Sequence, residues 1–191
     1  MEKEKIRTTA LKLFTEKGVE STGIKEIAEY SNVSEDEIKE HFSTKKELVA
    51  DLYAVGKSGM LKFVYGELVE IEDFKELMHK VFYQSIIWGI NNEDMFYFMN
   101  YIQQHPYQWG DEEKIYPTTN EGIRRRSEEA MKKGVIKQLP LDFVVHFMSG
   151  MHASCVSYIL SIGAVTEDEY LQLMEPMFDT CWGALKNDNN D

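Results

Sequence analysis

Apolar residues recur at helical spacing along nearly the whole chain, and no convincing run alternates with the period of two that a strand requires. In the first segment Ile6, Leu13 and Phe14 share one helical face, and Gly18 stands where a glycine commonly follows a helix end. The pattern therefore predicts an all-α fold that opens with an amphipathic helix.

Capping signals mark the short helices that follow. Thr22 is placed to cap a second helix, and Ser34 with Glu37 forms the S-x-x-E pattern of a capping box at the start of a third. Thr44 begins the same pattern for a fourth helix, and Asn32 stands in the turn where a left-handed residue is expected. Two short helices joined by a tight turn and preceded by a packing helix predict a helix-turn-helix.

Longer helices fill the rest of the chain. The fourth helix is expected to run to about Gly66, Thr166 opens the last helix with a capping box, and Pro176 is expected to kink it. The remaining helices are predicted over about residues 73–90, 93–104, 111–133, 140–162 and 166–185. We therefore divide the chain into a helix-turn-helix domain, residues 1–48, and a C-terminal helical domain, residues 49–191.

The charge balance narrows the class of partner. The formal net charge is −12, and residues 1–48 hold nine Lys/Arg against eleven Asp/Glu, a net of −2. This balance speaks against a general, strongly basic nucleic-acid binder. The third helix is especially acidic and has Lys39 as its one lysine. Its acids are Glu35, Asp36, Glu37 and Glu40.

Two interpretations of these acids stay open. Acids in the first turn stabilise a helix by roughly 0.3–1 kcal/mol. Alternatively, a carboxylate can accept a hydrogen bond from the amino group of cytosine in the major groove. Because the acids also repel phosphate, we predict modest, salt-sensitive DNA affinity. The lysines expected to offset them are Lys25, Lys39, Lys45 and Lys46.

The stretch IRTTALKLFTEKGVESTGIKEIAEYSNVSEDEIKEHFSTKKELVADLY resembles the TetR-type transcriptional regulators. The resemblance covers roughly the first 50 residues closely, and the later helices agree with the family only in number, length and order. It implies an all-α homodimer whose two helix-turn-helix heads bind double-stranded operator DNA with palindromic half-sites about 34–36 Å apart. It also implies a small-molecule effector in the C-terminal core that changes the spacing of the heads, so the regulator is expected to be a repressor.

By resemblance, phosphate-contacting positions fall on Thr22, Lys25, His41 and Lys45. The full set of residues expected to face DNA is Thr22, Lys25, Ser34, Glu37, Lys39, His41 and Lys45. The chain departs from the family at Asp36, where a small residue or glycine is usual, and at Lys39, where an aromatic residue is usual. These departures keep a second interpretation open, in which the acidic head has lost DNA binding and contacts a protein partner.

Residues 95–109 are rich in aromatic residues and methionine, which fits either core packing or a broad, adaptable ligand pocket. The candidates for effector contact are Phe82, Ser85, Trp88, Met95, Phe98, Met99, Ile102, Tyr116, Met148, His152 and Cys155. Residues 141–160 are apolar on nearly all sides, so this helix is expected to be buried both by its own core and by a partner. The resemblance implies that this helix and the last one form the homodimer interface.

The sequence gives little support to a secreted protein, a membrane protein or an enzyme. The chain starts without a signal-peptide pattern and its most apolar stretches look too short to span a membrane, so a cytoplasmic protein without membrane contact is expected. Glu76 and His79 form a lone Glu-x-x-His, Cys155 has His152 one turn away, and both patterns are incomplete for a metal or nucleophilic enzyme. We therefore expect no cofactor, no metal and no enzyme, with two reduced cysteines, while a metal-dependent helical enzyme is the remaining alternative.

Overall fold

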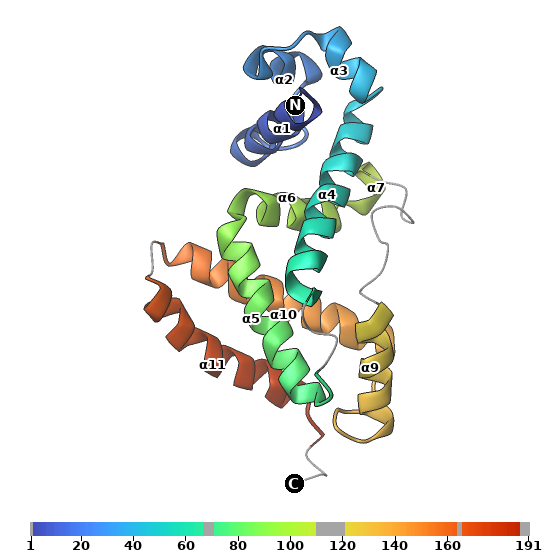
Figure 1. The fold of residues 1–191 in the computed structure, drawn as a ribbon, viewed down its shortest axis with the longest axis vertical. Coiled ribbons are helices and arrows are strands. Elements are labelled where there is room, and N and C mark those ends of the chain that lie inside the picture. Colours follow the sequence, from blue (N-terminus) through green and yellow to red (C-terminus); the bar gives the residue numbers. More distant parts are fainter. Residues whose placement is uncertain (1, 67–70, 110–120, 164–165, 188–191) are drawn as a thin grey trace. The chain divides into compact units, whose positions relative to one another are not determined.

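Helices dominate the part of the chain that the computed structural model describes, which is residues 2–66, 71–109, 121–163 and 166–187 (Figure 1). Within these ranges the only β-type pairing is an isolated antiparallel bridge between Ile136 and Lys186. The predicted all-α fold is confirmed, with a helix-turn-helix head and a helical core.

The helices form two compact units. The first unit comprises Met1–Gly59 with the described part of Asn92–Pro117, and the second comprises Met60–Asn91 with the described part of Thr118–Asp191. The first unit holds α1 (Glu2–Lys17), α2 (Ile24–Ser31), α3 (Glu35–His41), most of α4 (Lys45–Tyr65), α6 (Glu93–Gln104) and α7 (Pro106–Trp109). The second unit holds α5 (Phe74–Asn91), α9 (Glu121–Lys132), α10 (Leu141–Ser161) and α11 (Glu167–Leu185).

Packing in the first unit joins the head to α4 and α6. The rings of Phe14 on α1 and Phe98 on α6 stack with centroids 5.8 Å apart. Arg7 on α1 makes a two-pronged ion pair with Asp51 on α4, with Nε–Oδ2 at 2.7 Å and Nη2–Oδ1 at 3.0 Å. Such planar, bidentate contacts fix geometry as well as supplying energy. The head is therefore anchored to α6 by a stacked pair of buried rings and to α4 by one oriented ion pair.

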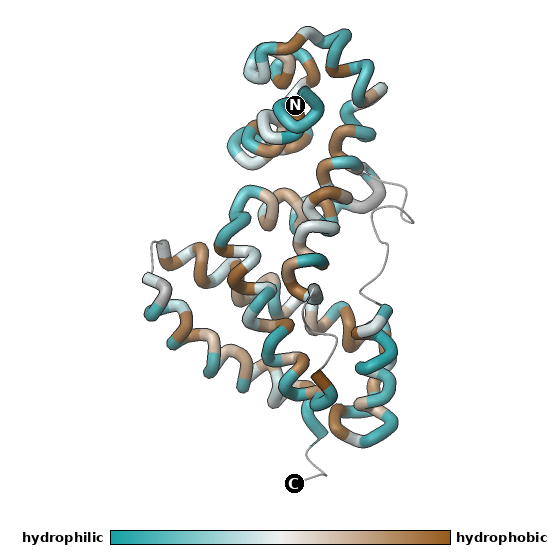
Figure 2. The backbone as a smooth tube through the Cα atoms, in the orientation of Figure 1, coloured by the Kyte–Doolittle hydropathy of each residue, from teal (hydrophilic) through white to brown (hydrophobic). Residues whose placement is uncertain are grey.

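The second unit is built around the apolar face of α5, which appears as hydrophobic positions along that helix in Figure 2. Gly89 lets α10 approach closely, since a Cβ at this position would lie 2.6 Å from Cγ1 of Val156. Phe82 sits between His152 of α10 and Phe178 of α11, at centroid distances of 5.5 and 5.7 Å. These contacts tie α5, α10 and α11 into one core.

Most predicted helix ends are confirmed within a residue or two, and two details are corrected. Gly23 is the N-cap of α2 and makes no side-chain cap bond, so the prediction that Thr22 caps this helix is wrong. At α4 the amide of Glu47 donates to Thr44 Oγ1, but the Glu47 carboxylate accepts from the amide of Ser43, so the capping box is displaced by one residue. The capping boxes at Ser34 and Thr166 form as predicted.

Two further expectations concern the second unit. The part of the predicted helix 111–133 that precedes Glu121 lies outside the described residues, and the described part is α9. The 21 residues of α10 are long and apolar enough to cross a membrane by length and composition alone, so the expectation that every stretch is too short is wrong for this helix. Core helices of soluble proteins meet the same criteria, and α10 packs against α5, α9 and α11.

Candidate nucleic-acid interface

The turn between α2 and α3 is held by one left-handed residue. Asn32 has φ 51° and ψ 48°, a conformation that asparagine tolerates better than most side chains. The amides of Asn32 and Val33 donate to the carbonyls of Glu29 and Ala28, which closes the end of α2. The chain is thereby redirected into α3, as in a helix-turn-helix.

The start of α3 is fixed by a reciprocal pair of bonds. The amide of Glu37 donates to Ser34 Oγ at 3.2 Å, and the Glu37 carboxylate accepts from the Ser34 amide at 2.6 Å and from its hydroxyl at 2.7 Å. The bonds from the Ser34 amide and hydroxyl lower the pKa of Glu37. Glu37 therefore helps to cap the N-terminus of α3, the helix in which it lies.

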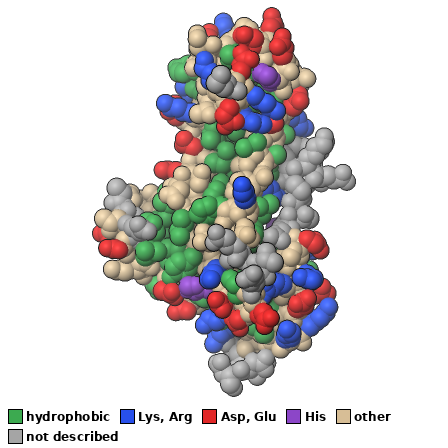
Figure 3. Space-filling model, in the orientation of Figure 1, with side chains coloured by type: hydrophobic (Ala, Val, Ile, Leu, Met, Phe, Trp, Pro, Cys, Tyr) green, Lys and Arg blue, Asp and Glu red, His purple; other side chains and the backbone are tan. Residues whose placement is uncertain are grey.

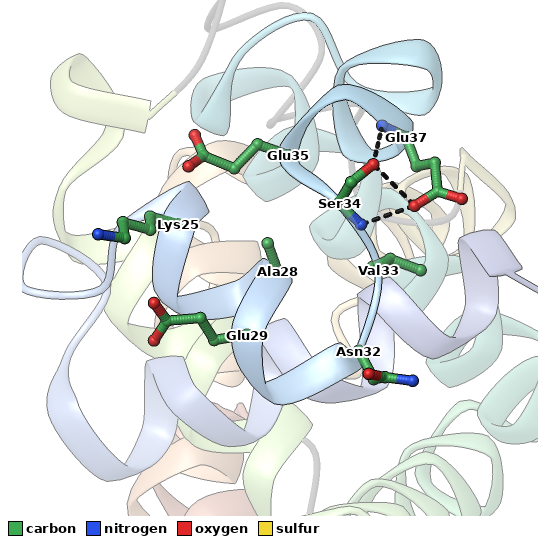
Figure 4. Close-up of a pocket in the computed structure, with 8 residues that line it drawn as sticks. All are labelled: Lys25, Ala28, Glu29, Asn32, Val33, Ser34, Glu35 and Glu37. Atoms are coloured by element: carbon green, nitrogen blue, oxygen red, sulfur yellow. Dashed lines mark hydrogen bonds between the residues drawn. The ribbon is translucent and has the colours of Figure 1, made fainter.

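An open groove of about 420 Å³ lies between α2 and α3 (Figure 4). Its lining residues are Lys25, Ala28, Glu29, Asn32, Val33, Ser34, Glu35 and Glu37. In Figure 4 the side chains of Lys25, Glu29 and Glu35 lie on one side of the groove, and the bonded Ser34–Glu37 pair lies on the other. The structure thus brings together three of the predicted DNA-facing residues: Lys25, Ser34 and Glu37.

The other four predicted residues lie outside this groove. Thr22 is fully buried and its hydroxyl lies within bonding distance of the carbonyls of Gly18 (3.0 Å) and Leu13 (3.3 Å), so its side chain is occupied within the fold. The Nζ of Lys39 lies 3.3 Å from Asp36 Oδ1, and Nε2 of the half-exposed His41 lies 3.4 Å from Glu2 Oε2.

Lys45 is also engaged, at the start of α4. Its Nζ donates to the carbonyl of Glu20 at 3.1 Å and lies 5.1 Å from the ring centroid of Trp109. Burial lowers the pKa of Lys45, and the nearby Glu20 opposes that shift. This lysine therefore has to leave internal contacts if it is to bind a phosphate.

Cations without an internal partner are scarce in the head. Among the described residues of the first 48, Lys5, Lys25 and Lys46 are exposed and have no hydrogen bond or ion pair, and Glu35 and Glu40 of α3 are exposed and equally without one. The charge of Lys5 on α1 already acts on an α3 carboxylate, whose pKa it helps to lower. Acidic side chains accordingly gather at the end of the head that carries α3 (Figure 3). Any DNA contact must therefore overcome local repulsion of phosphate, or use a carboxylate to read a base.

Sequence reasoning missed Glu29 as a groove residue and Lys46 as an unpaired cation. The signal for Glu29 was available, because it stands four residues after Lys25 on the same helical face. Lys46 was named among the lysines expected to offset the acids, but its lack of a partner could not be predicted, because that depends on how α4 packs.

The predicted effector contacts divide between the two units. Met95, Phe98, Met99 and Ile102 belong to the first unit, where the last three are buried. Phe82, Ser85, Trp88, Met148, His152 and Cys155 belong to the second unit, and Tyr116 lies outside the described residues. Burial lowers the pKa of His152 to about 4, so its imidazole is neutral at physiological pH. The convergence of these residues on one pocket stays a prediction.

His79 belongs to the Glu-x-x-His pattern, which can bind a metal ion, but in the structure its partner is the carboxylate of Glu175. Its Nε2 lies 2.9 Å from Glu175 Oε1 on α11, and the hydroxyl of Tyr83 donates to the same oxygen at 2.9 Å. Among the described residues, no group of three or more His, Cys, Asp or Glu side chains could hold a metal ion. The contact joins α5 to α11 and gives the Glu-x-x-His pattern a structural role.

A helix-turn-helix that presents a capped second helix at the surface, carried on a helical core, is an arrangement found in DNA-binding regulators of transcription. Residues 6–52 match the model of the family described as bacterial regulatory proteins, tetR family, which confirms the resemblance seen in the sequence. No curated protein matches the chain.

Solved structures share the fold over nearly the whole chain. A TetR-family transcription regulator from Marinobacter aquaeolei has a TM-score of 0.80 at 14% identity, covering 97% of this chain and 96% of that one. A TetR-family regulator from Haemophilus influenzae has a TM-score of 0.75 at 16% identity, covering 97% and 96%. The fatty acid degradation regulator FadR from Bacillus halodurans has a TM-score of 0.73 at 13% identity, covering 94% of each chain. The family model and all three structures describe regulatory proteins.

Proposed function

We propose that this protein is a cytoplasmic, ligand-responsive repressor that binds a palindromic operator as a homodimer and is released by a small molecule. The observation that carries the proposal is the α2–turn–α3 unit, with Asn32 in the left-handed conformation and α3 capped by Ser34 and Glu37. An effector changes DNA affinity only through unequal affinity for two conformations, and α4 provides a continuous helix leading away from the head.

The homodimer is supported by apolar surface on α10. Phe143, Tyr158 and Ile162, which follows the end of α10, are 52%, 50% and 43% exposed, and the ring of Phe147 stacks on Phe143 at 5.8 Å. Only 28% of the most apolar 18-residue stretch of α10 is buried within the chain. A face of this kind is a protein-interaction surface in a soluble protein, and α10 with α11 is the proposed site of self-association.

A second candidate function rests on the acids of the head. Glu35 and Glu40 are exposed, and Lys39 of the same helix is paired with Asp36. A surface with this charge attracts a basic protein partner, whereas it repels the phosphates of DNA. In that function the head would show no salt-dependent DNA binding.

The decisive experiment is selection of bound fragments from random-sequence duplex DNA by the purified protein, at low and at physiological salt. Enrichment of a palindrome with half-sites about one helical turn apart supports the repressor function. A selected operator then serves in an effector screen, in which a compound that lowers affinity for that operator supports release by a ligand.

Failure to enrich any sequence has two separable causes. A co-purified ligand can hold the protein in its released form, and refolding without ligand restores selection in that case. Continued failure after refolding, together with capture of a basic protein by the wild-type head but not by a Glu35→Gln, Glu40→Gln variant, would support the protein-partner function instead.

A further inference from the structure

Lys45, the first residue of α4, is held on two sides by parts of the chain that are distant in sequence. Its Nζ donates a hydrogen bond to the carbonyl of Glu20, between α1 and α2, at 3.1 Å. The same Nζ lies 5.1 Å from the ring centroid of Trp109, the last residue of α7. The neighbouring Lys46 is exposed and has no hydrogen bond or ion pair among the described residues. The contacts therefore single out one of two adjacent lysines.

The turn from α6 into α7 sets the position of Trp109. The amide of His105 donates to the carbonyl of Ile102 at 3.1 Å, and the amide of Gln108 donates to the carbonyl of His105 at 3.2 Å. The ring of His105 stacks on Tyr101 of α6 with centroids 4.3 Å apart. These contacts attach α7 to the end of α6, and α7 lies beside α4 in the same compact unit as the head (Figure 1).

Both contacts of Lys45 make its ammonium group harder to transfer to a phosphate. The face of an indole ring attracts a cation, and this attraction grows as water is excluded from the pair. Burial lowers the pKa of Lys45, as expected for an ammonium group that is partly withdrawn from water. A phosphate oxygen therefore has to displace the ring of Trp109 and the carbonyl of Glu20 before it can bind this lysine.

We propose that Trp109 is an inhibitory residue, which holds Lys45 away from DNA until the lysine side chain moves off the indole ring. The head then has two forms. In the held form Lys45 stays against the protein, and in the released form it joins the exposed Lys46 at the start of α4. Since sequence-independent DNA affinity rises with the number of phosphate contacts, the released form binds DNA more tightly. This inference rests on the proposed function, because it assigns a regulatory contact to the same DNA-binding head.

The contact also gives the proposed effector a direct route to the head. A single residue separates α6 from α7, and α6 carries four of the predicted effector contacts, which are Met95, Phe98, Met99 and Ile102. A ligand that favours the docked arrangement of α7 would favour the held form of Lys45, and DNA affinity would fall. This route acts within one protomer and requires no change in the spacing of two heads.

The first test detects the contact in the full-length protein without DNA. The chain has three tryptophans, so its proton–nitrogen NMR spectrum is expected to show three indole resonances, and the one absent from Trp109→Phe belongs to Trp109. Lys45→Ala is expected to shift this resonance. Lys46→Ala removes the adjacent charge and should leave the resonance in place. Equal shifts in both lysine variants, or a shift in neither, would overturn the contact.

The second test measures binding to a short fluorescent duplex of random sequence between about 50 and 200 mM salt. Trp109→Ala is expected to raise affinity at least about threefold, and Trp109→Phe, which keeps an aromatic face beside Lys45, should raise it less. The gain from Trp109→Ala should persist in a Lys46→Ala background and vanish in a Lys45→Ala background. An unchanged or lower affinity, or an equal gain in both backgrounds, would overturn the inhibitory role.

Two other causes of a negative result are separable. If Trp109→Ala fails to fold, Trp109→Leu takes its place, since leucine fills space without an aromatic face. If wild type binds the duplex and neither variant changes the affinity, the inhibitory role fails while the proposed function stands. If no variant binds duplex DNA at any salt concentration, the proposed function fails together with the inhibitory role, and the indole resonance still shows whether Lys45 is held by Trp109.

Discussion

At the scale of single residues, the acids of α3 do not all have the same effect on a DNA partner. Glu37 is held by the amide and hydroxyl of Ser34, and Asp36 is paired with Lys39. Glu35 and Glu40 remain exposed without a bonding partner among the described residues. Glu37 and Asp36 therefore make contacts within α3, and Glu35 and Glu40 are the acids left available to a partner.

The capping role of Glu37 predicts an acid-dependent loss of stability. Folding lowers its pKa below the ordinary value of 4.5, so its contribution is present above that pH and is lost as the pH falls through the folded-state pKa. Urea unfolding midpoints measured between about pH 6 and about pH 3 should fall less steeply in Glu37→Gln than in wild type. Glu40→Gln is the matched control on the same helix, and an equal change in both variants would contradict the role of the cap.

Replacing Lys25 should change the salt dependence of DNA binding. It is exposed, lines the groove between α2 and α3, and has no internal partner among the described residues. Lys25→Ala should weaken binding to every sequence and reduce the slope of log K against log salt by about 0.9 for each phosphate contact removed. Lys133→Ala removes the same charge outside the head and should leave the slope unchanged. A loss of preference at one base position, with an unchanged slope, would instead make Lys25 a base-reading residue.

At the scale of the element, the approach of α5 to α10 depends on Gly89. A Cβ there would lie 2.6 and 3.0 Å from the two Cγ atoms of Val156, whose β-branched side chain has little rotamer freedom in a helix. Gly89→Ala should therefore lower the free energy of unfolding by about 1–3 kcal/mol in a urea titration.

Two further variants separate packing from helix propensity at Gly89. Gly59 lies within α4, and a Cβ added to it would meet no atom within 4 Å, so Gly59→Ala should stabilise the protein by about 0.5–1 kcal/mol. Adding Val156→Ala to Gly89→Ala should recover part of the lost stability. Equal effects of the two glycine substitutions would show that α5 and α10 are not in close contact.

The elements could be predicted where their signals are local. Ser34 and Glu37 are three residues apart, so their capping box is visible in the sequence and forms in the structure. Thr22 carries an equally good local signal, but its hydroxyl is used by carbonyls of the α1–α2 connection, which tertiary packing decides. The ion pair of Arg7 with Asp51 joins two distant positions, and helical periodicity alone does not say which helices meet.

At the scale of the whole molecule, the exposed aromatic face of α10 predicts a homodimer. Tyr158→Glu places a charge on that face and should shift the protein towards monomer in sedimentation equilibrium by at least about tenfold in dissociation constant. Tyr97 on α6 is 43% exposed, close to the 50% of Tyr158, and Tyr97→Glu is therefore the matched control. If the control dissociates the protein equally, self-association does not depend on α10.

The small number of unpaired lysines in the head has a consequence for the time a regulator needs to find its site. Sliding and hopping along a chromosome depend on sequence-independent attraction between cations and phosphates. A head in which Lys5, Lys25 and Lys46 are the described cations without a hydrogen bond or ion pair, beside unpaired carboxylates, would be held only briefly by random sequence. Such a protein would scan short stretches between many dissociations, and a larger fraction of its copies would be diffusing freely when a signal arrives.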